Sequence, residues 1–174
     1  MAYNEYMRKE IINTLLFWLS YFIFITIVNS LYSFSYWPLY VGGLFGLLMP
    51  NLDHLLHVFV FKPQELTSQR VSQLVQNKQY KEAIILLYDT KNERKDLIFH
   101  TVQFQIIFSI LTFWVVSSSG NLFARGLVLS YYLCFVIFNL KKFVNKELIL
   151  DNEDSTRIYF AAMVLALFIF GFLV

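Results

Sequence analysis

The chain has 174 residues, of which 57% are hydrophobic, 19% aromatic and 15% charged, and its formal net charge is +2. A soluble domain carries roughly 45–50% apolar and about 25% charged residues, so this composition excludes an ordinary soluble protein and predicts a polytopic membrane protein. The small net charge gives no reason to expect nucleic acid as a partner. The single cysteine, Cys134, excludes an intramolecular disulfide framework and a metal site built from cysteines alone.

Five apolar segments are long enough to cross about 30 Å of hydrocarbon, which takes roughly 20 helical residues. Only helices suit spans of this length, because backbone polar groups in lipid must be satisfied within the segment. We therefore expect an all-α fold: a bundle of about five transmembrane helices in a single membrane domain over residues 1–174. The first span is not followed by a small-residue cleavage site and reads as uncleaved. The expected spans are 11–32, 38–61, 97–117, 122–140 and 158–174.

Basic residues are distributed unevenly between the predicted loops. The turn at 33–37 holds none, and Arg125, just after the turn at 118–121, is expected to snorkel from the first turn of its span. The other thirteen of the fourteen Lys and Arg residues fall on one side. The positive-inside rule then predicts a cytoplasmic N-terminus. These thirteen are Arg8, Lys9, Lys62, Arg70, Lys78, Lys81, Lys91, Arg94, Lys95, Lys141, Lys142, Lys146 and Arg157.

The predicted cytoplasmic segment at 62–96 is too long to be structureless by default. Pro63 favours a helix start, and the apolar residues after it predict a short amphipathic helix. A second helix is expected over 80–88, with Asn77 and Lys78 in the turn between the two. The simplest interpretation is a helical hairpin on the cytoplasmic membrane face; a substrate lid or a partner-docking element is the alternative. The expected packing residues are Leu66, Val71, Leu74 and Val75 in the first helix and Ala83, Ile84 and Leu87 in the second.

Polar residues interrupt the end of the second span. Asp53, His54 and His57 lie there, and His100, the only other histidine, lies at the head of the third span. An Asp at the centre of a membrane helix costs roughly 2.5–3.5 kcal/mol on insertion scales, so such residues are a functional-site hypothesis by default. With the predicted topology, all three histidines and Asp53 share one membrane depth.

This cluster has the residue types of a metal site. Asp53 and His57 are four residues apart and fall on one helix face, and His100 would add a third ligand from the next helix. Three protein ligands leave a position open for water, as catalytic divalent sites require. We expect zinc, manganese or iron, with His54 orienting a ligand or moving a proton. The alternatives are a hydrogen-bonded Asp–His pair that joins helices and histidines satisfied by water or lipid head groups.

A family resemblance extends this hypothesis. The segment 46–54, Gly-Leu-Leu-Met-Pro-Asn-Leu-Asp-His, resembles the G-x-x-x-P-D-x-D-H segment of the bacterial membrane-bound metal-dependent hydrolases, which are YdjM-like, LexA-regulated inner-membrane proteins. Phe99-His100-Thr101 is similar to the end of that family's H-R-G-x-T-H-S segment. The resemblance implies a small helical protein of the bacterial inner membrane in which Asp53, His54 and His100 are candidate metal ligands. His57 rests on its spacing alone.

The sequence also departs from the family pattern. Asn51 stands where the pattern has its first aspartate, and the H-R-G run has no counterpart. Two functions follow as alternatives. The first is a metal-dependent hydrolase acting on a lipid-linked or phosphate ester at the cytoplasmic leaflet. The second is a non-enzymatic membrane protein whose Asp/His cluster fixes helix packing and whose cytoplasmic hairpin docks a partner.

Two further patterns concern helix packing. Gly42 and Gly46 form a G-x-x-x-G pair, which predicts close packing within the bundle or in an oligomer with membrane lipid around it. A transporter pathway would need polar groups at the midplane and across several helices. Gln103, Gln105 and Asn29 are polar residues within the spans. They are scattered along the sequence, so we expect no such pathway.

Overall fold

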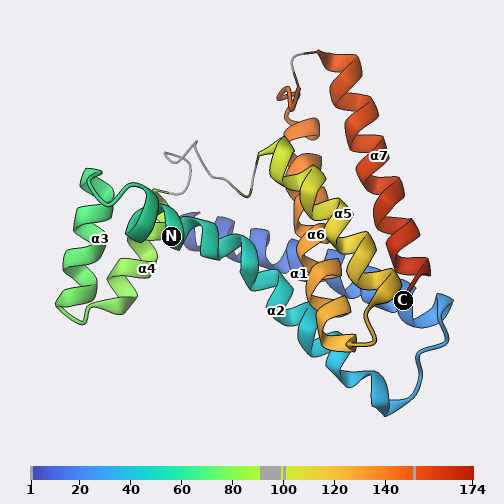
Figure 1. Ribbon diagram of the computed structural model, residues 1–174. Helices are drawn as coiled ribbons and strands as arrows, with labels where there is room; N and C mark the ends of the chain where they lie inside the picture. The colour runs from blue at the N-terminus through green and yellow to red at the C-terminus, as the bar shows by residue number, and fades with distance from the viewer. Residues whose placement is uncertain (1, 91–98, 100, 151) are drawn as a thin grey trace. The chain divides into compact units, whose positions relative to one another are not determined.

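The structure is a computed structural model (Figure 1). It describes residues 2–90, 99, 101–150 and 152–174, without the side chains of 2–8, 10, 51, 54 and 88. Every regular element in these residues is a helix and none is a strand, which confirms the predicted all-α class. In chain order the elements are α1 (Ala2–Val28), η1 (Phe34–Tyr36), α2 (Trp37–Leu56), η2 (His57–Phe61), α3 (Leu66–Gln76), α4 (Tyr80–Asp89), α5 (Val102–Ser118), α6 (Leu122–Val144) and α7 (Glu153–Phe172).

Within the described residues, three helices are long and apolar enough to cross a membrane: α1, through Ile11–Val28, and all of α6 and α7. The apolar helix α5 has 17 residues, and the first part of the predicted third span falls outside the described residues. Helix α2 has 20 residues, but Asn51, Asp53 and His54 lower its hydropathy. Many large apolar side chains of α1, α5 and α7 are exposed, as lipid-facing residues of a membrane protein would be.

The chain divides into two compact units. The core unit comprises residues 1–47 and 105–174, and the loop unit comprises residues 48–104. The first boundary lies within α2, just before Pro50, whose missing N–H leaves the carbonyl of Gly46 without its helical donor. The loop unit thus extends beyond the expected insertion at 62–96 and includes the end of α2.

Glycines hold α2 close to α6 inside the core unit. A Cβ atom on Gly42 would meet the carbonyl oxygen of Phe123, and one on Gly46 would meet that of Leu127. The reverse holds from α6, where a Cβ atom on Gly126 would meet the carbonyl oxygen of Leu39. The G-x-x-x-G face therefore packs within the chain, which is one of its two expected uses.

Helices α3 and α4 pack on each other, and α3 also packs on η2, in the loop unit. Val58, Val71 and Ala83 form a buried cluster, and Leu74, Val75, Leu86 and Leu87 cover it. The expectation that Leu66 and Ile84 pack here is wrong, because these residues are 76% and 66% exposed. In α4 the packed residues are Ala83, Leu86 and Leu87, which are at i, i+3 and i+4. Ile84 follows Ala83 and therefore points about 100° away from it around the helix. Lys78, in the turn between the helices, has a φ of 60°.

We expect Ala83→Leu to destabilise the protein by about 1–3 kcal/mol, because the added atoms must enter the buried cluster of the loop unit. For a chain of this size, this lowers the melting temperature by roughly 2–4 °C per kcal/mol. The matched control is Ala162→Leu, since Ala162 is exposed on α7. Thermal unfolding in detergent measures both variants, and equal melting temperatures would contradict the packing of α3 on α4.

Candidate functional site

Asp53 lies near the end of α2 and is buried, with 1% of its surface exposed. Its Oδ2 atom accepts a hydrogen bond of 2.9 Å from the backbone N–H of Phe99, a residue 46 positions later in the chain. The Phe99 ring in turn stacks on Phe104 at a centroid distance of 4.8 Å. A hydrogen bond to a carboxylate is charge-assisted and stronger than a neutral one. The residue before His100 is therefore fixed against the polar end of α2.

His57 is 2% exposed and begins the π-helix η2. The backbone N–H of Lys62 donates to the carbonyl of His57 at 2.8 Å, which closes the wider turn. The Nε2 atom of His57 lies 3.4 Å from Oε2 of Glu65, and the other carboxylate oxygen lies 3.5 Å from Nζ of Lys62. Single π-turns occur often at functional sites. No sequence signal marks this π-turn, because residues 58–61 are apolar like most of the helix before them.

Glu65 is a site residue that the sequence analysis missed. It precedes α3 as its N-cap, and 45% of its side chain is exposed. Two ligands that each lie about 2.1 Å from a tetrahedral ion are roughly 3.4 Å apart, so the separation of Glu65 from His57 also suits two ligands of one metal. The available signal was its position just after Pro63, at the start of the predicted helix.

The other predicted site residues are only partly described. The backbone of His54 lies in α2, but its side chain is outside the described part, and His100 lies outside the described residues altogether. Among the side chains that are described, no group of three or more His, Cys, Asp or Glu residues could hold a metal. Asp53 thus does not join His57 and Glu65 as a third ligand. A metal bound by His57 and Glu65 would need a further ligand besides the described side chains.

A second polar cluster joins three helices of the core unit. Gln105 of α5 and Asn139 of α6 are each 1% exposed. The Nδ2 atom of Asn139 donates to Oε1 of Gln105 at 2.7 Å and to Sδ of Met163 at 3.0 Å. The hydroxyl of Tyr159, on α7, donates to the same Gln105 oxygen at 2.7 Å.

The view of Gln105 as one of several scattered polar residues is therefore wrong. Residues of α5, α6 and α7 that are 20 to 54 positions apart in sequence converge on its side chain, as helix crossing allows. Asn29 is separate and donates to the carbonyl of Gly171 at 2.7 Å. Gln103 is exposed. These bonds join helices of the core unit.

Arg125 binds backbone carbonyls. Its Nε atom donates to the carbonyl of Ser119 at 2.7 Å, and its Nη1 atom donates to the carbonyl of Val174 at 2.7 Å. The guanidinium thus links the turn before α6 to the residues after α7. These two hydrogen bonds connect the ends of α6 and α7 in the core unit. From the sequence we expected only that Arg125 would snorkel.

No protein-family model, curated protein or solved structure matches the chain. The likeness to the metal-dependent hydrolases therefore rests on the two short sequence windows around Asp53 and Phe99.

Proposed function

We propose that the chain is a multi-pass protein of the bacterial inner membrane that binds a divalent metal at the polar end of α2. In this proposal the chain crosses the membrane five times, and both its N-terminus and the α3–α4 hairpin are cytoplasmic. Asp53, His57 and His100 hold the metal, and His54 orients a ligand or moves a proton. The substrate class is a lipid-linked or phosphate ester at the cytoplasmic leaflet, as in a metal-dependent hydrolase.

One observation carries the proposal: the hydrogen bond from the Phe99 N–H to the buried Asp53 carboxylate. It joins the two sequence windows that resemble the hydrolase family, although they are far apart in the chain. A buried carboxylate is costly unless hydrogen bonds or a cation compensate it. In the proposed site, the imidazole of His100, the residue after Phe99 in the sequence, completes the ligand set of a cation held by this carboxylate.

The ligand types suit the proposed metals. One carboxylate and two imidazoles are ligands that zinc, manganese and iron all accept. When bound, such a metal lowers the pKa of a coordinated water and polarises a phosphoryl or carbonyl oxygen. Glu65 would hold the His57 ring in place by accepting a hydrogen bond from its Nε2–H, leaving the other ring nitrogen free to ligate.

A non-enzymatic membrane protein is the second candidate, and the hydrogen-bond partners that His57 and Asp53 already have favour it. His57 already pairs with Glu65, and Asp53 already accepts the Phe99 N–H, so both residues have partners within the loop unit. In this alternative the cluster fixes the packing of the loop unit, and α3 and α4 dock a partner protein.

Elemental analysis of the detergent-purified protein separates the two candidates. We expect nearly stoichiometric zinc, manganese or iron in the native chain and at least a tenfold loss in the His57→Ala, His100→Ala double variant. Asp53→Asn should also lose metal. Asp89→Asn, at an exposed carboxylate of α4, is the matched control and should retain it. Trace metal at equal levels in all four proteins would contradict metal binding and support the non-enzymatic alternative.

A further inference from the structure

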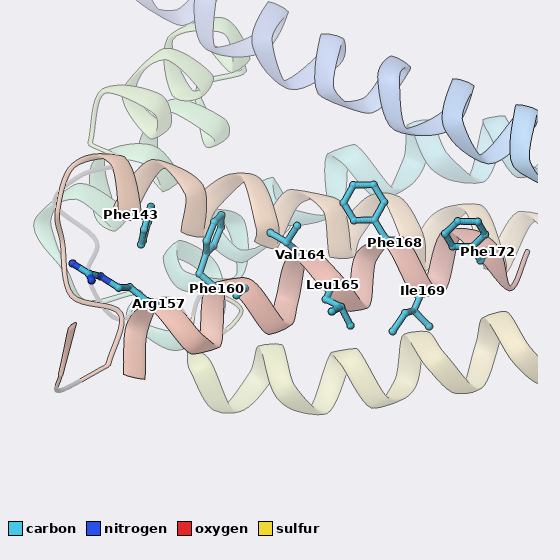
Figure 2. Close-up of a pocket in the computed structure, with 9 residues that line it drawn as sticks. Phe143, Arg157, Phe160, Val164, Leu165, Phe168, Ile169 and Phe172 are labelled. Carbon is cyan, nitrogen blue, oxygen red and sulfur yellow. The ribbon is translucent and has the colours of Figure 1, made fainter. Parts of the chain in front are cut away.

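An apolar groove runs along one face of α7 (Figure 2). Its volume is about 620 Å³, and it is lined by one residue of α6, Phe143, and by a stripe of α7 residues at helical i, i+3, i+4 spacing. The stripe runs from Arg157 at one end to Phe172 at the other. These fifteen steps of helix span about 22 Å. One leaflet of hydrocarbon is about 15 Å deep, so the groove can hold a complete acyl chain.

The two ends of the groove differ in charge. Of the nine lining residues, which all belong to the described part of the chain, Arg157 alone is charged, and the rest are apolar. The guanidinium lies 3.5 Å from Glu153, but the side chains are 64% and 75% exposed. An exposed pair of this kind is weak, so a phosphate group can replace the carboxylate. In the sequence just before this end, residues 141–154 hold three basic residues and four acidic ones: Lys141, Lys142 and Lys146, and Glu147, Asp151, Glu153 and Asp154.

Aromatic rings that line the groove pack against other rings at both of its ends. At the charged end, Phe143 stacks on Phe160 with a centroid distance of 5.1 Å and an interplanar angle of 13°. At the apolar end, Phe168 and Phe172 both pack edge-to-face against Phe24 of α1, at 5.5 and 5.6 Å. Such ring pairs restrict side-chain rotation, so little conformational entropy is lost when a chain enters.

We propose that this groove binds one anionic phospholipid, with its phosphate on Arg157 and an acyl chain along α7. Two features of the groove identify this occupant. The single cation, Arg157, lies at the end where α7 begins, and the apolar surface that follows it is long enough to cross one leaflet. This site lies in the core unit and shares no residue with the proposed metal site. It rests on the insertion of α7 into the membrane but not on metal binding.

The test measures which lipid stays bound to the full chain. The protein is reconstituted in vesicles of equal phosphatidylglycerol and phosphatidylcholine and extracted with mild detergent. Mass spectrometry then counts the retained lipids. We expect the native chain to prefer phosphatidylglycerol about five-fold, the size that one basic residue near a membrane surface supplies. Arg157→Gln should abolish this preference, whereas Arg70→Gln, an exposed arginine of α3, should keep it.

A second variant tests the apolar part of the groove. Leu165, which is 61% exposed, lines the middle of the stripe, and Leu165→Trp should fill it and displace the retained lipid of both kinds. Equal retention of both lipids by the native chain and all variants would overturn the proposal and leave ordinary lipid contact. An intermolecular cross-link through Leu165→Cys would also overturn it, because a second copy of the chain would then occupy the groove. The metal content of the same samples reports separately on the site at α2.

Discussion

Gly126→Ala is expected to separate α2 from α6 and to destabilise the core unit by about 3 kcal/mol. The new Cβ atom would meet the carbonyl group of Leu39 and would lie 3.0 Å from the backbone N of Gly43. Both are backbone atoms of another helix, so no side-chain rotation can relieve the contact and the helices must move apart. Overpacking of this kind costs about 1–3 kcal/mol and occasionally more.

Helix propensity acts in the opposite direction, but it is the smaller effect. Alanine is more favourable than glycine inside a helix by about 0.8–1.0 kcal/mol. The clash with Leu39 exceeds this gain, so the net effect is a loss of stability. A loss of about 3 kcal/mol corresponds to a fall in melting temperature of roughly 6–12 °C for a chain of this size.

Thermal unfolding of the detergent-purified protein measures the effect. The matched control is Gly120→Ala, because a Cβ atom on Gly120 would have nothing within 4 Å among the described residues. This control should melt within about 1–2 °C of the native chain, since surface substitutions change stability by roughly ±0.5 kcal/mol. A Gly126→Ala protein as stable as the native chain would show that α2 and α6 are not in backbone contact.

Gln105→Leu is expected to have the second-largest effect, a loss of about 2–4 kcal/mol. The substitution removes the shared acceptor of Asn139 and Tyr159, so that the buried amide donor of Asn139 and the half-buried hydroxyl donor of Tyr159 both lose it. An unsatisfied buried group costs about 1–3 kcal/mol, although a hydrogen bond between membrane helices is worth only about 0.6 kcal/mol on average. The unpaired donors therefore account for most of the expected loss.

A double-mutant cycle tests the shared oxygen directly. Tyr159→Phe removes one donor and should cost little by itself, because Gln105 still accepts from Asn139. In the Gln105→Leu background, Tyr159→Phe should reduce the free energy of unfolding by less than it does in the native chain, or should even increase it. The reason is that Tyr159→Phe then removes a donor that has lost its acceptor. Gln103→Leu is the control, as this exposed glutamine lies two residues earlier. Equal destabilisation by Gln103→Leu and Gln105→Leu would contradict the network.

The candidate site could be predicted only in part. The sequence placed Asp53 at the end of a long helix and the Phe99–Thr101 window close by in the bundle, and the 2.9 Å hydrogen bond between Asp53 and Phe99 agrees with that proximity. It did not identify Glu65 as the partner of His57. That pairing depends on the π-turn at His57–Phe61 and on where α3 begins. The contribution of His100 stays a prediction.

The sequence by itself determined the helical class and most helix positions. An apolar run of about 20 residues has few alternatives to a helix in lipid, and α6 begins at Leu122 as its pattern predicts. The turn at Asn77 and Lys78 was equally local. These features depend on composition and periodicity along a single stretch of chain.

Only the tertiary structure decided which side chains meet. Gln105 gave no sequence signal that it would receive Asn139 and Tyr159, and the G-x-x-x-G pair gave no sign that Gly126 was its counterpart on α6. Ile84 shows the same limit at the scale of one residue, since apolar character alone did not tell it from Ala83. The physical reason is that a helix has several apolar faces, and the crossing of neighbouring helices selects the one that is buried.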